Sequence, residues 1–267
     1  MPSDADPEGS GAARVEIVAL AGIPEIRPGD DLATALCDAI AATTDFLPLR
    51  PDDVLVVTQK IVSKAEGAVV DLTTVTPRPE AVEFARRWDR DPRQIEVVLR
   101  EARRVVRMDR GLLITETPHG FVCANGGVDA SNVGPASGSV VTLLPRDPDA
   151  SASGIRRAVG ERFGVDMPVI VSDSFGRPWR WGIVDVAIGV AGMAPLDDLR
   201  GQPDHDGRVM RSTVRAVVDE IASAAELVLG KTAGRPAAVV RGARPPLAGT
   251  EATAHDLVMP AENDLFR

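Results

Sequence analysis

A carboxylate, a hydroxyl and two arginines lie within eight residues of one another in the second half of the chain: Asp173, Ser174, Arg177 and Arg180. The apolar run before them, 167–171, predicts a short buried strand, and the glycines and proline beyond predict that the strand then gives way to a loop. Open α/β sheets place ligand contacts at the C-terminal ends of their strands. Acidic groups beside basic ones suit a divalent metal ion held against phosphate oxygens. A turn capped by the aspartate, with a local ion pair, explains the same residues about equally well.

A second polar segment, Asp129 to Asn132, lies between glycines and offers a carboxylate, a hydroxyl and an amide. These are oxygen ligands of the kind that hard divalent ions prefer. An Asx-turn accounts for the segment nearly as well. The sharper hypothesis is that Asp129 and Asp173, from distant parts of the chain, hold one metal ion together.

Only three of the thirty lysine and arginine residues are lysines, and each lies in a segment that could bind phosphate. Lys60 and Lys64 follow a predicted strand at the i, i+4 spacing of one helix face, which favours a phosphate clamp over a solvated pair. Lys231 lies in a glycine-rich turn, 230–236, after a predicted helix; a glycine C-cap explains the first glycine of this turn but not its two cations. A further loop, 23–26, could bring backbone amides to a nucleotide, although an ordinary loop is the simpler interpretation.

The elements that must position these residues follow one another without a strict βαβ rhythm. Asp30 or Asp31, Asp91 and Asp149 predict helix N-caps. We expect strands at 14–20, 54–58, 111–116, 120–124, 140–144, 167–171, 184–190 and 237–240, and helices at about 30–43, 79 onward, 91–104, 149–163 and 213–229. This mixture favours an α+β fold with a mixed sheet over a doubly wound fold.

Composition and charge limit the possible functions. The 267 residues can form one large domain or two modest ones, and a net charge of -9 gives no basic field for nucleic acid or anionic lipid. Residues 1–13 are polar and predict a disordered tail. Cys37 and Cys123 predict two buried free thiols in a reducing compartment. Because Asp185 interrupts the best apolar run, we expect no membrane span and a cytoplasmic protein.

Familiar nucleotide and metal motifs are missing from the sequence. It contains no Walker A loop, no Rossmann fingerprint and no zinc spacing. The three histidines, His119, His205 and His255, are too scattered for a triad or metal site to be proposed from them.

Four motifs, in chain order, are similar to those of one known family: Gly29-Asp30-Asp31-Leu32, Ile61-Val62-Ser63-Lys64-Ala65-Glu66-Gly67, Val128-Asp129-Ala130-Ser131-Asn132-Val133-Gly134 and Asp173-Ser174-Phe175-Gly176-Arg177-Pro178-Trp179-Arg180. The chain from about Ile17 to its C-terminus thereby resembles the coenzyme F420-0:L-glutamate ligases, also called F420-0:γ-glutamyl ligases.

This resemblance implies an activity and an assembly. The implied enzyme is a GTP-dependent amide ligase of coenzyme F420 biosynthesis that uses Mg or Mn and a monovalent cation such as potassium. The γ-phosphate of GTP would pass to the lactyl carboxylate of F420-0, and the amine of L-glutamate would attack the acyl phosphate; a further glutamate would be joined by a γ-linkage. The implied fold of residues 14–267 is an α+β protomer of two interleaved subdomains, in an intertwined homodimer.

The resemblance also implies roles for individual residues. Asp129, Asp173 and Lys64 would be catalytic; Asp129 and Asp173 would hold the metal ion, and Ser174 would be a ligand to a second ion. Arg177 and Arg180 would bind substrate. The nucleotide would contact Ile23, Pro24, Glu25, Ile26, Gln59, Lys64, Asn132, Leu229, Gly230, Lys231, Thr232, Ala233, Gly234, Arg235 and Pro236.

Three residues depart from the family pattern. Gln59 stands where many relatives have serine, and Trp181 occupies a place that is usually polar. Lys231 falls where some relatives carry an amide or carboxylate for the second ion; a charged ammonium cannot ligate metal. Two alternatives therefore stay open: a related amide ligase with a different carboxylate acceptor, and a nucleotide- or coenzyme-binding protein without catalysis. Retention of both aspartates favours catalysis.

Overall fold

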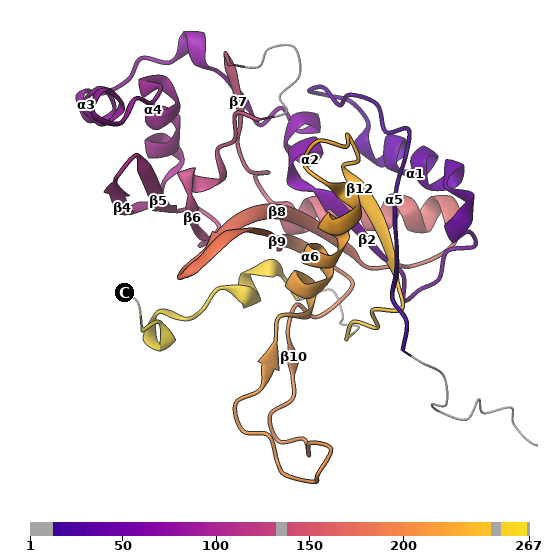
Figure 1. Ribbon diagram of the computed structural model, residues 1–267. Coiled ribbons are helices and arrows are strands. Elements are labelled where there is room, and N and C mark those ends of the chain that lie inside the picture. The colour runs from indigo at the N-terminus through magenta and orange to yellow at the C-terminus, as the bar shows by residue number, and fades with distance from the viewer. Residues whose placement is uncertain (1–12, 132–137, 247–251, 266–267) are drawn as a thin grey trace, which may run out of the picture.

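A five-stranded mixed sheet forms the centre of the molecule (Figure 1). The computed structural model describes residues 13–131, 138–246 and 252–265. The strands lie in the order β1 (Glu16–Ala19), β12 (Ala237–Arg241), β2 (Val54–Thr58), β8 (Val169–Arg177) and β9 (Arg180–Ala191). Neighbouring strands pair antiparallel except β2 and β8, which are parallel. The predicted α+β fold with a mixed sheet is therefore confirmed.

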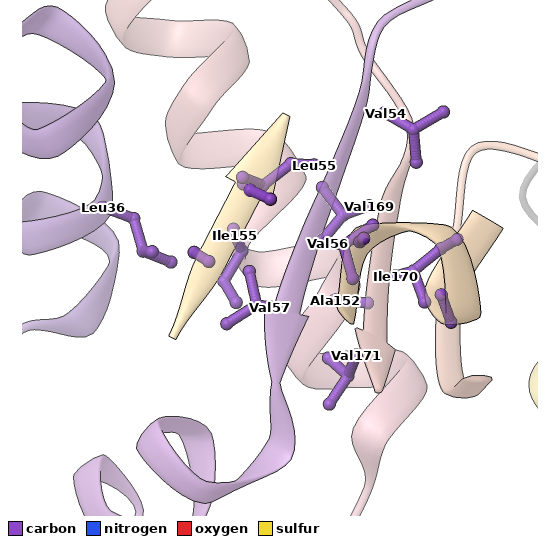
Figure 2. Packing of buried hydrophobic residues seen from close by; sticks show 14 of the residues in the cluster. Leu36, Val54, Leu55, Val56, Val57, Ala152, Ile155, Val169, Ile170 and Val171 are labelled. Atoms are coloured by element: carbon purple, nitrogen blue, oxygen red, sulfur yellow. The ribbon is translucent and has the colours of Figure 1, made fainter. Parts of the chain in front are cut away.

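The main core lies on both faces of this sheet. Helices α1 (Leu32–Ala42) and α5 (Pro148–Phe163) cover one face, and α6 (Val217–Leu229) covers the other (Figure 1). The apolar residues of β2 and the first three residues of β8, Val169 to Val171, are completely buried, and Figure 2 shows several of them packed with Leu36 of α1 and Ile155 of α5. A continuously apolar strand suits a position covered on both faces, because neither side of it meets water.

A smaller part of the molecule has an apolar core of its own. Helices α3 (Pro79–Trp88) and α4 (Pro92–Glu101) pack on a three-stranded sheet of β4 (Arg104–Asp109), β5 (Leu112–Glu116) and β6 (Val122–Ala124). The strands β3 (Val69–Asp71) and β7 (Val140–Thr142), which precede and follow this smaller part in the sequence, pair antiparallel with each other. The boundary between the expected subdomains stays a prediction.

The strand that carries Asp173 and Ser174 is longer than predicted. The prediction that it ends near Val171 and gives way to a loop is wrong, because β8 continues to Arg177 and returns as β9. The turn between them holds Trp179 at a φ of 56°. Cross-strand pairing with the β-favouring residues of β9 satisfies the backbone of a segment for which the nearby glycines and proline predict a loop.

Several other boundaries differ from the prediction. Asp149 does not cap α5: Asp147 does, by accepting from the Ala150 amide, whereas Asp149 accepts from the amides of Val190 and Ala254. The helix expected from 213 begins at 217, after the strand β11 (Val214–Arg215), which pairs with β10 (Asp197–Asp198). The segment 104–109, expected as the end of a helix and a connection, forms β4.

Other expectations are confirmed. Asp31 caps α1 by accepting from the Thr34 amide, and Asp91 caps α4. Both cysteines are free and buried. Among the described residues, every helix is too short or too polar to cross a membrane. The predicted tail, 1–13, lies outside the described residues except for Ala13.

Candidate active site

One end of the central sheet gathers the segments that the sequence marks as chemical. Because β2 and β8 are parallel and Thr58 pairs with Ser172, the start of α2 (Gln59–Ala65) and Asp173 emerge at the same end. β12 runs antiparallel to β2, so the 229–236 turn reaches that end as well, and β1 delivers the 23–26 loop there. Four segments far apart in the chain therefore meet at one end of the sheet, where these strands begin or finish.

Lys60 connects α2 to the Asp129 segment. Its ammonium lies 2.5 Å from Asp129 Oδ2, 2.6 Å from the carbonyl oxygen of Ser131 and 3.0 Å from Ser131 Oγ. Asp129 Oδ1 accepts from the Ser131 amide at 2.7 Å, the hydrogen bond of the predicted Asx-turn. Two residues before the turn, Gly127 has a φ of 72°, and a Cβ there would lie 2.5 Å from Leu144 Cγ, so this position requires glycine. The turn and the charged cluster are thus one structure.

Asp129, which the sequence hypothesis pairs with Asp173, lies close enough to influence the ionisation of Asp173. Burial, followed by the negative charges of Asp129 and Asp185, raises the pKa of Asp173 to about 7. Burial opposes ionisation of Asp129 too, but hydrogen bonds from Lys60 and Ser131 hold its pKa below the ordinary value. Two carboxylates that repel each other in a partly buried place are a fitting site for a cation.

The donor set also indicates which kind of cation would fit. Within the described ranges, no group of three or more His, Cys, Asp or Glu residues is arranged around a metal position. Cys123 lies near Asp173, but burial first and that negative charge second raise the pKa of its thiol to about 12, so it supplies no thiolate. Magnesium is commonly held by one or two carboxylates together with water and substrate phosphates. The residues present fit one such ion at Asp129 and Asp173.

Ser174 is engaged by protein groups on both sides. Its hydroxyl donates to Asp185 Oδ1 at 2.5 Å, and the Lys231 ammonium donates to its oxygen. Lys231 also lies 3.6 Å from Asp185 Oδ1 and 4.0 Å from Glu226 Oε1. A hydroxyl oxygen that accepts from an ammonium does not fit a second metal ion at the same place, since two cations would repel each other there.

Asp185 is a site residue that sequence reasoning missed. In the sequence it stands out only as the break in an apolar run, yet the structure buries it, at 2% exposure, beside Ser174. It also accepts from Ser172 Oγ at 3.3 Å. The sequence feature that could have revealed it is the single acid within an apolar strand, because a buried aspartate needs polar partners.

The predicted nucleotide-binding residues surround the same end of the sheet. Lys64 is buried and lies 2.7 Å from Glu25 Oε1, which joins α2 to the 23–26 loop. Gln59 is also buried, and its Oε1 accepts from Ser63 Oγ at 2.7 Å. In that loop Ile26 is buried and Glu25 is exposed. Asn132 lies outside the described residues.

The turn at 229–236 brings Lys231 to Ser174. Leu229 is buried at the end of α6, and Gly230, with a φ of 62°, forms the helix C-cap as predicted. The chain then returns to the sheet, where the carbonyl oxygen of Pro236 accepts from the Thr58 amide at 2.9 Å. The turn is therefore held at its start by the end of α6 and the contact with Ser174, and at its end by the hydrogen bond to Thr58 of β2.

Arg177 and Arg180 lie opposite each other in the backbone register at the tip of the β8–β9 hairpin. At about 3.3 Å per strand residue, Arg177 lies roughly 13 Å along β8 from Asp173. Trp181 beside them is fully exposed and Trp179 is largely exposed. These arginines can therefore reach only a ligand that extends from the sheet end along the hairpin.

His119 and His255, which the sequence leaves unconnected, lie in one pocket of about 260 Å³ with Arg103 and Arg146. His119 Nε2 is 3.1 Å from the Arg146 carbonyl oxygen. Asp147 and Asp149 line the same pocket and offset its positive charge.

Comparison with known proteins adds an independent line of argument. The model of a family described as F420-0:γ-glutamyl ligase matches residues 22–242. The chain belongs to this family. The match spans four of the five strands of the central sheet, Asp129, Asp173 and the 229–236 turn, so this member of the F420-0:γ-glutamyl ligase family is an enzyme.

Individual relatives in this family are similar over nearly their whole length. The coenzyme F420:L-glutamate ligase of Methanopyrus kandleri is 44% identical over 246 residues, 91% of this chain and 94% of the relative. That of Methanothermobacter thermautotrophicus is 40% identical over 254 residues, 95% of this chain and 99% of the relative. That of Methanocaldococcus jannaschii is 38% identical over 255 residues, 95% and 97% of the two chains.

Proposed function

We propose that this enzyme is a GTP-dependent ligase that joins L-glutamate to the lactyl carboxylate of coenzyme F420-0, and a further glutamate by a γ-linkage, in coenzyme F420 biosynthesis. The observation that carries the proposal is the gathering of Asp129, Asp173, Lys60 and Lys64 at one end of the sheet. The relatives that are named coenzyme F420:L-glutamate ligases support it.

The proposed chemistry has two steps. The acceptor carboxylate attacks the γ-phosphorus of GTP, which forms an acyl phosphate and releases GDP. The amine of glutamate then attacks the acyl carbon, which forms the amide and releases phosphate. Phosphoryl transfer needs little covalent help from a protein; it needs positioning and positive charge around the phosphate oxygens.

The residues at the sheet end are suited to these tasks. Asp129 and Asp173 would hold a magnesium or manganese ion, which supplies positive charge to the phosphate oxygens when bound. Lys64 and Lys60 form ion pairs with Glu25 and Asp129, and arriving phosphates can compete for both ammonium groups. The 23–26 loop and the 229–236 turn would hold the rest of the nucleotide. A monovalent cation such as potassium stays a part of the proposal without a residue assigned to it.

The acceptor would lie along the hairpin. Arg177 and Arg180 stand beyond Asp173 in the direction that a long anionic acceptor could take, so they would bind its carboxylate or phosphate groups. The acyl phosphate must also be kept from water until the amine arrives.

The exposed end of the hairpin favours a homodimer. β9 is an edge strand of the sheet, and Trp181 and Ile183 on it are 102% and 57% exposed. An edge strand with exposed large apolar side chains offers a surface on which another chain can pair. Light scattering that gives the mass of a single chain at micromolar concentration would exclude this assembly.

A product assay tests the function. Purified protein is incubated with GTP, Mn²⁺, L-glutamate and F420-0, and the products are identified by mass. We expect F420 with added glutamate, its formation dependent on GTP and on metal. Products that form equally well without nucleotide, or with another carboxylate acceptor in preference to F420-0, would refute the proposal.

A further inference from the structure

Lys231 is held in a setting that the nucleotide site does not by itself require. Its ammonium contacts the Ser174 hydroxyl and lies 3.6 Å from Asp185 and 4.0 Å from Glu226. These three groups come from β8, β9 and α6, so the lysine spans the point where the hairpin meets the helix. Three oxygen neighbours of this kind match the three N–H donors of an ammonium group.

Asp185 accounts for this placement. It is buried, whereas the Lys231 side chain is 52% exposed, so the carboxylate is the fixed partner and the lysine the adaptable one. Asp185 accepts a hydrogen bond from the Ser174 hydroxyl, which directs the lone pairs of that oxygen towards the ammonium. Its backbone carbonyl accepts from Ser223 Oγ of α6 at 2.6 Å, which holds the strand against the helix.

We infer that Lys231, positioned by Asp185, is the second cation of the phosphate-binding site, so that the enzyme uses one divalent ion per chain. This inference rests on the proposed function. It opposes the expectation from the sequence resemblance that Ser174 binds a second ion, because the ammonium already occupies the Ser174 oxygen. Lys231 would meet the phosphates, and Asp185 acts through it as a positioning residue.

The first test counts metal ions. Mn²⁺ is titrated calorimetrically into the full-length protein saturated with GDP. We expect one ion per chain for the parent protein. Lys231→Met removes the charge without adding a ligand and frees the oxygens of Ser174, Asp185 and Glu226, so a second, weaker Mn²⁺ should bind. Two ions in the parent would overturn the inference, and so would a single ion in both proteins with equal GTP affinity.

The second test separates positioning from stability. Asp185→Asn and Lys231→Met should each weaken GTP binding about tenfold, the effect of losing one charge-assisted hydrogen bond. The double variant should be no weaker than Lys231→Met alone, because Asp185 acts through Lys231. Asp219→Asn is the matched control: this carboxylate also bonds to β9, at the Ala187 amide, and its loss should change stability but not GTP affinity.

The outcomes distinguish this inference from the function beneath it. Additive losses in the double variant would show that Asp185 acts independently of Lys231. Weaker GTP binding in the Asp219 variant would assign the effect to the fold. A parent protein that binds GDP and Mn²⁺ at no site would refute the proposed function, whereas two tightly bound ions would leave that function standing and refute only the role of Lys231.

Discussion

Replacing Lys60 by methionine should tighten the binding of manganese in the absence of nucleotide. In the structure both oxygens of Asp129 are engaged: Oδ2 by Lys60 at 2.5 Å and Oδ1 by the Ser131 amide at 2.7 Å. A metal ion that binds this carboxylate must therefore displace or share the ammonium. Methionine keeps most of the apolar side chain and removes the competing charge.

The magnitude follows from the exposure of the pair. A hydrogen bond to a charged group contributes about 1.5–3 kcal/mol, and an exposed ion pair less than about 1 kcal/mol. Lys60 is 16% exposed and Asp129 38%, so solvent screens part of the interaction. We expect a gain of roughly 1–2 kcal/mol in the free energy of metal binding, or roughly 5- to 30-fold in affinity.

The assay is calorimetric titration of Mn²⁺ into the nucleotide-free protein. Lys64→Met is the matched control, because Lys64 lies on the same helix but pairs with Glu25, 2.7 Å away, and its loss should leave manganese affinity unchanged. Weaker metal binding by the Lys60 variant would refute the reasoning, since it would mean that Lys60 orients Asp129 for the metal. Equal tightening in both variants would indicate a general effect of charge.

Three further predictions concern catalysis, nucleotide binding and stability. Asp129→Asn and Asp173→Asn should each lower turnover at least about a hundredfold, the usual loss when an electrostatic contact to the transition state is removed; a near-normal rate in either would take that residue out of the metal site. Lys64→Ala should weaken GTP binding more than glutamate binding in equilibrium titrations, and equal effects would return Lys64 to a structural role. Glu96, mainly through its hydrogen bonds with Arg78, has a pKa lowered from 4.5 to about 2, so its stabilising effect is complete above pH 4.5 and is lost as the pH falls towards 2. Glu96→Gln should lower the free energy of unfolding by about 2 kcal/mol at pH 7 and by much less near pH 2, measured by urea denaturation, and an equal loss at both pH values would contradict this.

The parts of the site that the sequence could predict are those that local rules determine. The sequence pairs Asp129 and Asp173 as oxygen ligands beside glycine and at a strand. The parallel strands β2 and β8 bring the start of α2 and Asp173 to the same sheet end, and Lys60 of α2 holds Asp129 there. The i, i+4 spacing placed Lys60 and Lys64 on one helix, and α2 is that helix.

The parts that the sequence missed depend on pairing over long distances. Asp185 reaches Ser174 only through the register of the β8–β9 hairpin, and Lys231 only through the packing of α6 on it. Asp147 and Asp149 flank the same proline, and either could cap α5 by local rules. Long-range hydrogen bonds to Val190 and Ala254 engage Asp149 elsewhere.

The most direct test of the account follows the oxygen atoms of the acceptor. F420-0 labelled with ¹⁸O in both oxygens of its lactyl carboxylate is converted with GTP, Mn²⁺ and L-glutamate, and the released phosphate is analysed by mass. Activation of the carboxylate by phosphoryl transfer predicts one ¹⁸O atom in each phosphate, because the bond between acyl carbon and bridging oxygen breaks when the amine attacks. Phosphate without the label, formed at the same rate as the amide, would contradict the central claim.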